Sequence, residues 1–498
     1  MKYNELPDWV FKFKVKGTQI NKINNKFYLY KIKSVWDKEK KRAVKKNEKY
    51  LGRITEEGLI SSKVQQLEER YKNISVKEIG ATYLLHEYSK DIIVNLKEIF
   101  PLQWKEIFIS ALFRLTENTH LKNLSFYYNN SYSSELIKEA KLSQKSLGNF
   151  FRELGMQRRL IVNYTNKFTT NVESIAIDMT NIFSNSRNIT SAMLGHNKDS
   201  IYVPQINLIL LYSLDKNQPI HFRMVPGSIR DVSILIKTIN ETTIKNVIFI
   251  GDKGLNSEAN VQALKDEELK YVLGVRRDSS LIDYNKIRKI EKKEKAFAFD
   301  KRIIWHHSEQ YKDEKIITYL DSQLKASEDS DLILRIKGLE EISTKSKLSE
   351  EQKTDLKNYK QRLFEDNIKS GTFTIRTNLS ESEERIYQIM KSRIDIEQSF
   401  DTLKNCVEVE RSFMRDDKQI EGWLFINFIA LQMYYKIYAK LLEKNMLNNN
   451  SPEDIIVHLK RISALKLNDA WVLSEIPKKS RQTLSMLDIK EDLLLKMV

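Results

Sequence analysis

Three acidic residues lie at the ends of strand-like segments or within a long helical pattern. Asp178 ends the β-branched segment 173–178, Asp252 directly follows the apolar segment 246–251, and Glu397 lies in the helical pattern. Carboxylate oxygens without histidine or thiol ligands suit a hard octahedral ion such as Mg²⁺. Two such ions can activate a water or a 3′-hydroxyl and stabilise the leaving oxygen at phosphorus. We therefore expect these three acids to hold two Mg²⁺ ions, for which Mn²⁺ can substitute.

The elements that must position these acids follow a definite order along the chain. Strands are predicted at 173–178, 205–214, 219–225, 246–251, 271–275 and 373–378, and helices at about 228–240, 256–267 and 380–405. Ser380 and Glu383 match a capping box at the start of the last helix. An RNase H-like α/β fold has this order, with its first three strands antiparallel and the fourth parallel to and beside the first. Matching ends of such neighbouring strands, about 4.8 Å apart, can share one ion.

The long helix carries two cations around its acid. Arg393, Glu397 and Lys404 stand at positions i, i+4 and i+11, which place them on one face because three turns take about 10.8 residues. Cations on either side of a metal-binding acid suit a phosphate held beside the ions. An ordinary surface stripe, in which Arg393 pairs with Glu397, gives the same pattern.

The composition of the chain limits the classes of protein it can be. Its 498 residues predict two to four domains, and 83 Lys and Arg against 67 Asp and Glu give a net charge of +16. Such an excess favours DNA as a partner, although a codon-biased genome also raises basic charge. The single cysteine, Cys406, forms no intrachain disulfide and fits a reducing cytoplasm. The apolar run from Trp423 to Tyr435 is too short for a membrane span and predicts a buried helix.

Two N-terminal segments have patterns that DNA-binding elements use. Residues 26–36 and 50–54 read as short strands around the basic turn 37–49, and this hairpin could lie on a phosphate backbone or carry only a solvated loop. Residues 133–155 suit a helix-turn-helix whose second helix, about 145–154, enters a major groove, although any two short helices give this pattern. Lys141, Lys145 and Arg152 are the phosphate contacts predicted there.

Four segments in this order resemble insertion-sequence DDE transposases of a large bacterial group with a β-rich insertion. They are SIAIDMTNIF around Asp178, VPGSIRD, VIFIGDKGLNSEANV around Asp252, and TFTIRTNLSESEERIYQIMKSRIDIEQSFDTLKN around Glu397. The group's helix signature is Y-(2)-R-(3)-E-(6)-K, and Arg393, Glu397 and Lys404 match its spacing. Met390 stands where the tyrosine belongs. Tyr387, one turn earlier, could partly replace it.

The resemblance implies a retroviral integrase-like core and a division into six regions. These are a β-rich basic region 1–60, a helical DNA-binding region 61–165, the first part of the core 166–279, a β-rich insertion 280–371, the second part of the core 372–440, and a C-terminal helical region 441–498.

The resemblance also implies an activity and its partners. A cytoplasmic, nucleoid-associated bacterial homodimer would bind the inverted ends of its element, cut them with the two ions, and join them to target DNA, while Arg393 and Lys404 position phosphates. Trp305 is the candidate to stack on a flipped base, with a core tryptophan as the plainer alternative. The rival functions are a DNA-binding relic without catalysis and a nuclease that cuts without joining.

Overall fold

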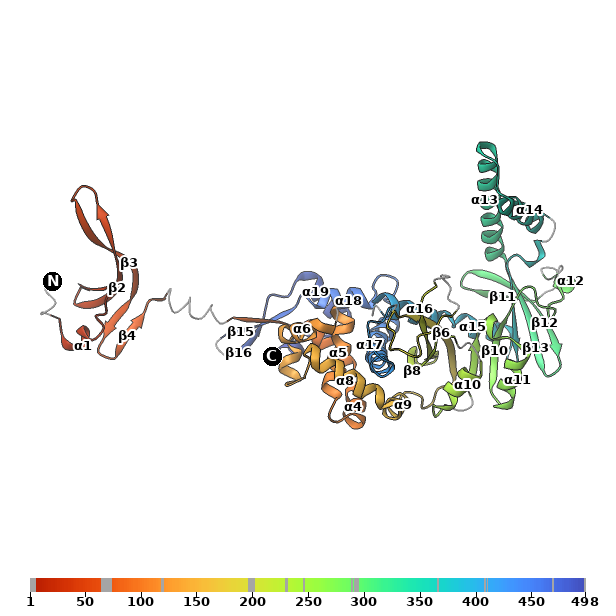
Figure 1. Cartoon of the computed structure of the whole chain (residues 1–498), viewed down its shortest axis with the longest axis horizontal. Helices are drawn as coiled ribbons and strands as arrows, with labels where there is room; N and C mark the ends of the chain where they lie inside the picture. Colours follow the sequence, from red (N-terminus) through yellow and green to blue (C-terminus); the bar gives the residue numbers. More distant parts are fainter. Residues whose placement is uncertain are drawn as a thin grey trace. The chain divides into compact units, whose positions relative to one another are not determined.

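The computed structural model describes residues 6–63, 74–117, 121–195, 202–228, 232–244, 247–287, 290, 295–364, 367–406, 409, 411–467 and 470–496. The chain forms two compact units (Figure 1). We call Met1–Gly80 with Leu459–Val498 the terminal unit, and Ala81–His458 the central unit. The terminal unit therefore contains both the N-terminal and the C-terminal part of the sequence.

The terminal unit contains two small antiparallel sheets. The first has the order β1-β2-β3-β4 and comprises β1 (Thr18–Ile23), β2 (Lys26–Asp37), β3 (Arg42–Thr55) and β4 (Gly58–Ser61), with α1 (Asp8–Phe11) packed on it through Val10. The second has the order β16-β15-β5 and comprises β5 (Ser75–Glu78), β15 (Ser463–Leu467) and β16 (Ala470–Leu473), with α19 (Lys478–Met486) and α20 (Glu491–Leu495) after it.

Two predictions for these terminal segments need correction. The predicted N-terminal hairpin is present as β2 paired with β3. However, residues 42–49 of the predicted basic turn lie in β3, so the turn itself is short. The C-terminal region is not helical throughout, because residues 463–473 contain the hairpin of β15 and β16. Residues 42–49 of β3 are exposed on both faces except for the partly buried Val44, so the lysines remain in solvent while their backbone pairs with β2.

The central unit is organised around a nine-stranded mixed sheet of order β11-β12-β13-β14-β10-β9-β6-β7-β8. Its strands are β6 (Ser174–Phe183), β7 (Gln205–Ser213), β8 (Gln218–Pro226), β9 (Ile248–Gly251), β10 (Lys270–Val275), β11 (Ala296–Phe299), β12 (Arg302–Tyr311), β13 (Glu314–Asp321) and β14 (Thr372–Thr377). The predicted pairing is confirmed, since β6, β7 and β8 form an antiparallel meander and β9 lies parallel beside β6. Helices α10 (Val232–Asn240) and α11 (Glu258–Asp266) connect the strands that follow β8.

The insertion between β10 and β14 differs from the prediction in its second half. Its strands β11, β12 and β13 continue the central sheet through the β13–β14 pair. The short helix α12 (Tyr284–Ile287) precedes these strands. The second half of the insertion is helical and consists of the hairpin of α13 (Ser322–Lys345) and α14 (Glu350–Phe364) (Figure 1). The expectation of mostly β structure is therefore wrong for residues 322–364. Asp321 begins α13 by accepting hydrogen bonds from two backbone N–H groups.

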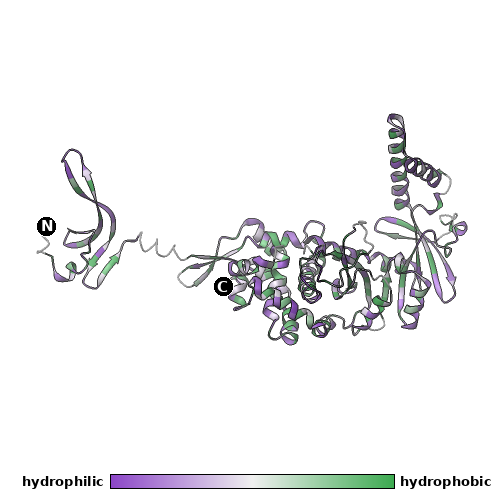
Figure 2. Cartoon of the chain, viewed as in Figure 1, coloured by the Kyte–Doolittle hydropathy of each residue, from purple (hydrophilic) through white to green (hydrophobic). Residues whose placement is uncertain are grey.

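A helical region precedes the sheet and packs around one long helix, α17 (Asp417–Glu443). It comprises α3 (Gly80–Tyr88), α4 (Lys90–Ile99), α5 (Trp104–Glu117), α6 (Leu124–Asn130), α7 (Ser133–Leu136), α8 (Gln144–Met156) and α9 (Arg158–Asn166), while α18 (Pro452–Leu459) follows α17. Hydrophobic residues alternate with hydrophilic ones along most of these helices (Figure 2). The predicted buried helix from Trp423 to Tyr435 is confirmed within α17. None of the helices that the structure describes is long and apolar enough to cross a membrane.

Helices α8 and α17 cross with their backbones in close contact. A Cβ atom added at Gly155 would lie 1.8 Å from the carbonyl oxygen of Lys418, and one added at Gly422 would lie 2.1 Å from that of Phe151. Only glycine fits at this crossing, and the contact joins the helical region to α17. Phe222 of β8 also contacts Phe428 of α17, so the same helix packs against the sheet.

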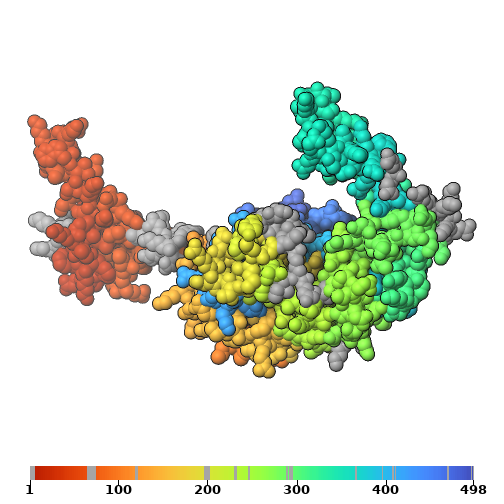
Figure 3. Space-filling view, turned by 45° about the vertical axis from the view of Figure 1, so that its right-hand side comes forward, coloured from red at the N-terminus to blue at the C-terminus, as the bar shows by residue number. Residues whose placement is uncertain are grey.

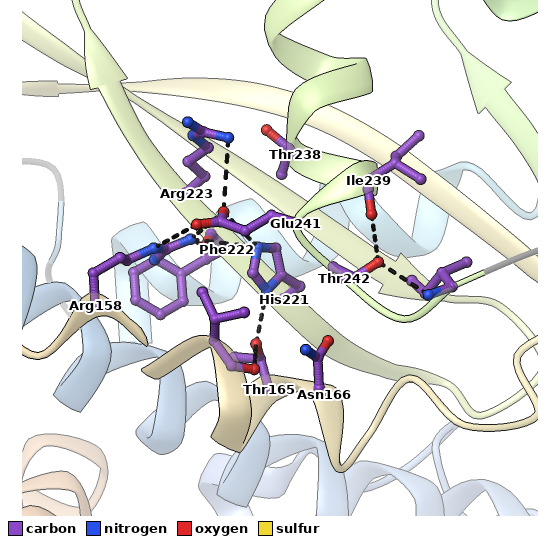
Figure 4. Close-up of polar contacts among 12 residues, drawn as sticks. Arg158, Thr165, Asn166, His221, Phe222, Arg223, Thr238, Ile239, Glu241 and Thr242 are labelled. Atoms are coloured by element: carbon purple, nitrogen blue, oxygen red, sulfur yellow. Dashed lines mark hydrogen bonds and ion pairs between the residues drawn. The ribbon is translucent and has the colours of Figure 1, made fainter. Parts of the chain in front are cut away.

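A buried polar cluster joins the helical region to the sheet (Figure 4). Arg158, at the start of α9, binds Glu241 at 2.8 Å and Glu421 of α17 at 2.9 Å. His221 of β8 lies against Glu241, and its Nδ1 is 2.7 Å from the Thr165 hydroxyl. Burial lowers the pKa of His221 to about 4. Burial also raises the pKa of Glu241, but hydrogen bonds from His221 and Arg158 outweigh it and bring that pKa down to about 2.

Candidate active site

Asp178 lies on β6, and Asp252 directly follows β9, the parallel strand beside β6. Ser174 pairs with Ile248 and Ala176 pairs with Ile250, so the same register continued by two residues brings Asp178 level with Asp252. The sequence predicted that Asp178 ends its strand, and this is wrong. β6 continues along β7 to Phe183, whereas β9 ends at Gly251. Asp178 is therefore in the middle of the β6–β7 pair but beyond the last paired residues of β6 and β9. On that side its neighbour is the segment after β9 that carries Asp252.

Arg393 connects Asp178 with Glu397. Its Nη2 donates to Asp178 Oδ2 at 2.7 Å, and its Nη1 donates to Glu397 Oε1 at 2.7 Å. The Arg393 side chain is 13% exposed and that of Asp178 25%, so this ion pair is shielded, whereas Glu397 is 51% exposed and its pair with Arg393 lies at the surface. The surface-stripe alternative explains the contact with Glu397 but not the one with Asp178, which lies on a different element. Two of the three predicted acids thus converge on one cation.

The predicted glutamate helix consists of three shorter pieces. α15 (Glu383–Lys391) begins at Ser382, whose side chain accepts from the Arg385 N–H, so the predicted cap at Ser380 is wrong. The helix is interrupted at residues 392–393 and continues as α16 (Ile394–Asp401). It ends in the π-helical η6 (Thr402–Cys406). The break lets Arg393 precede α16 and reach Asp178. The wider turn of η6 changes the direction of Lys404 from that of an unbroken helix.

A basic cleft of about 810 Å³ opens beside Asp252. Lys253 follows Asp252, and Arg276 follows β10, so both cations lie at the ends of parallel strands and line the cleft. On the insertion side, Arg277 binds Glu328 of α13 at 2.8 Å. Lys253 and Arg276 were not predicted from the sequence, although Arg276 directly follows a strand predicted to end at this edge and Lys253 follows Asp252.

The transposase DDE domain model matches residues 174–433, which include all three acids, Arg393 and Lys404. This match spans more than half of the chain. The chain belongs to the DDE transposase family. Among solved structures, the piggyBac transposase synaptic complex with hairpin DNA is similar at 9% identity, with 79% of this chain and 71% of that chain covered and a TM-score of 0.39. No curated protein matches the chain.

DDE transposase domains generally use divalent metal ions, and the three acids are the side chains that could hold such ions here. The side chains of Asp178, Asp252 and Glu397 offer only carboxylate oxygens, and these suit a hard cation. Within the described residues, no three His, Cys, Asp or Glu side chains are yet close enough together to hold an ion. Asp178 and Glu397 instead share Arg393. The carboxylate oxygens are therefore of the type that a divalent ion binds. Ion binding would require Arg393 to release Asp178 or Glu397.

The residues predicted to bind DNA outside the DDE core have different environments. Lys141 and Lys145 are exposed near the start of α8, where they can reach a phosphate. Arg152 binds Asp416, the residue that begins α17, through Nη2 at 2.6 Å. The structure therefore gives Arg152 a packing role between α8 and α17. Its predicted phosphate contact would have to compete with this ion pair.

Three further residues of the transposase signature and insertion lie against hydrophobic clusters. Tyr387 is 1% exposed and contacts the rings of Phe297 and Phe299, and burial raises its pKa to about 12. It is a core residue of this cluster, and its partial replacement of the signature tyrosine stays a prediction. Met390 packs against the same cluster. Trp305 is partly buried against Leu320 and its neighbours, which favours the core reading over the stacking one.

Proposed function

We propose that this DDE transposase binds the inverted ends of an insertion sequence and catalyses Mg²⁺-dependent strand cleavage and strand transfer from an RNase H-like core. The observation that carries the proposal is the convergence of Asp178 and Glu397 on Arg393, with Asp252 directly after β9, the strand that pairs with β6. The strand order β8-β7-β6-β9-β10 supports the RNase H-like assignment.

Each residue of the site has a distinct role in this proposal. Asp178, Asp252 and Glu397 would hold two Mg²⁺ ions, and Mn²⁺ can replace them. When bound, the ions supply activation of the attacking oxygen and neutralisation of the leaving oxygen. Arg393 keeps Asp178 and Glu397 together in the absence of ions, since it neutralises one of their two charges.

The DNA partner is positioned by cations around the acids. Lys253 and Arg276 line the cleft beside Asp252, where they would bind phosphates of the strand that is cut. Lys404 would bind a phosphate on the side of α16. The donor DNA is the pair of inverted element ends, the acceptor is target DNA, and a homodimer would hold both ends together.

The test uses the full chain, labelled duplexes from the DNA that flanks its gene, and Mg²⁺. Cleavage followed by joining is the expected result. Asp178→Asn, Asp252→Asn and Glu397→Gln should each reduce cleavage by at least about a thousandfold, because each removes one ion ligand. Their affinity for the same duplex should stay within about threefold of wild type.

A matched control and two other outcomes decide the proposal. Glu384→Gln on α15 changes an exposed acid of the same segment and should cut at the wild-type rate. Cleavage without joining would show a nuclease, and binding without cleavage would show a DNA-binding relic. If any of the three acid variants cuts normally, that acid does not belong to the site.

A further inference from the structure

The loop 411–415, between η6 and α17, is fixed at both ends by hydrogen bonds. The Ser412 N–H donates to the Phe183 carbonyl oxygen at 2.9 Å, and this contact attaches the loop to the last residue of β6. At the other end, the Arg415 N–H donates to Gln419 Oε1 at 3.0 Å, while its carbonyl accepts from the Ser186 hydroxyl at 3.1 Å. The loop therefore presents its side chains from a defined backbone.

Phe413 lies at the tip of this fixed loop and is 81% exposed. It lines two cavities at once, one of 360 Å³ bounded by Asn185 and Arg411, and one of 640 Å³ bounded by Asn149 of α8. In Figure 3, blue residues of this part of the chain reach the surface between orange and yellow segments. An exposed aromatic ring between two hollows has both of its faces accessible to a planar ligand.

The charged residues that line the two cavities are all basic, among polar and apolar neighbours. Arg411 and Arg415 flank Phe413, while Lys122 and Lys145 border the larger cavity. Over the part of the chain that the structure describes, neither lining includes an aspartate or glutamate. The amides of Asn185 and Asn149 can donate and accept hydrogen bonds. A polyanion with planar, hydrogen-bonding groups complements this combination of charge, aromatic ring and amides.

We propose that Phe413 and the two cavities beside it form a nucleotide site in which one base, unstacked from DNA, stacks on the phenyl ring while Arg411 and Arg415 bind its flanking phosphates. This inference rests on the proposed DNA transposase function. Phe183, which holds the loop, is five residues from Asp178 on the same strand, or about 17 Å at about 3.3 Å per residue. The site therefore contacts DNA within about five base steps of the phosphate at the acids.

The experiment measures binding of the full chain to two fluorescein-labelled duplexes of one sequence, one fully paired and one with a single unpaired 2-aminopurine. Wild type should bind the bulged duplex about tenfold more tightly, because its unpaired base reaches the ring without the cost of breaking a base pair. Phe413→Ala should lose this preference and keep its affinity for the paired duplex. Phe413→Trp should keep the preference and quench the 2-aminopurine fluorescence.

Phe126, on α6, provides the matched control, since it is 64% exposed and lines neither cavity. Phe126→Ala should retain the wild-type preference for the bulged duplex. The double variant Arg411→Gln, Arg415→Gln should weaken binding to both duplexes and reduce the slope of log affinity against log salt by about two.

Other outcomes separate this inference from the proposed function. A wild-type protein that binds both duplexes equally, or a Phe413→Ala variant that keeps the preference, overturns the nucleotide site. Equal weakening of both duplexes by Phe413→Ala also overturns it, because base stacking is then not involved. A wild-type protein that binds neither duplex instead refutes the DNA-binding function itself.

Discussion

Arg393 and Asp178 are 215 residues apart in the chain, yet the guanidinium of one donates to the carboxylate of the other at 2.7 Å. The same guanidinium binds Glu397, so one positive charge lies between two acids that are expected to bind ions. An arginine at this position stabilises the two carboxylates before any ion arrives. It also competes with an ion for them, and this competition gives a measurable consequence.

Arg393→Gln should raise the affinity of the metal-free protein for Mn²⁺ by roughly tenfold, because the positive charge that pairs with Asp178 and Glu397 no longer repels the ion. The same variant should cut DNA far more slowly. Titration calorimetry with Mn²⁺ measures the affinity without DNA. Arg385→Gln, which changes an exposed cation on α15, should leave the affinity unchanged. An unchanged affinity in Arg393→Gln would show that no ion shares these carboxylates.

The crossing of α8 and α17 should tolerate no side chain larger than hydrogen. Gly422→Ala places a Cβ atom against the Phe151 carbonyl, so the helices must separate, at a cost of about 1–3 kcal/mol of unfolding free energy. Gly148→Ala on α8 meets only Gln419 Nε2, at 3.6 Å. It should instead stabilise the protein by about 0.5–1 kcal/mol, because alanine favours a helix. Urea unfolding checks both, and equal effects of the two changes would refute the close crossing.

Arg158→Met should destabilise the central unit by about 3 kcal/mol, because it leaves Glu241 and Glu421 near each other without their shared cation. The neighbouring Arg159 is exposed, and Arg159→Met should change stability by less than about 0.5 kcal/mol. Urea unfolding followed by tryptophan fluorescence compares the two variants. A similar loss in both would mean that the buried cluster does not attach α9 to the sheet.

Stability should fall when the pH drops below neutrality, because His221 stays neutral in the folded protein. Its pKa is about 4 when folded and 6.5 when unfolded, so between these values only the unfolded state takes up the proton. The unfolding free energy should then decrease by up to about 1.4 kcal/mol per pH unit. Glu241, with a folded pKa of about 2 against 4.5, adds its own loss only below 4.5.

The substitution His221→Gln isolates this contribution. Glutamine does not titrate, so the variant should show a shallower loss of unfolding free energy than wild type between pH 6.5 and 4.5. Urea unfolding at several pH values within this interval measures the two slopes. Identical slopes would mean that His221 is already protonated in the folded protein.

The sequence predicted the pairing of β6 with β9 because the order of its strand and helix patterns is that of an RNase H-like fold, in which the fourth strand lies parallel to and beside the first. It did not predict the break before α16, since residues 392–393 are neither glycine nor proline and the helical periodicity continues through them. The contact between Arg393 and Asp178 depends on that break. Local propensity therefore located the residues of the candidate site but not the tertiary contact that brings two of them together.

The helical hairpin of the insertion shows a different kind of failure. Residues 336–366 are rich in Lys and Glu, which are good helix formers, but the family resemblance favoured β structure there. In this case the propensity of the residues was the better guide. By contrast, the lysines of β3 were assigned to a turn, although cross-strand pairing with β2 makes them a strand. Propensity alone could not reveal that pairing.

The pairing of β5 with β15 has a consequence for biosynthesis. β5 ends at Glu78 and its partner begins at Ser463, so the ribosome must make all of the central unit before β5 can complete its sheet. Residues 81–458 can fold while they emerge, because their sheet needs no strand from either end of the chain. A nascent chain stalled before residue 463 would thus carry a finished catalytic sheet but an incomplete second sheet in its terminal unit.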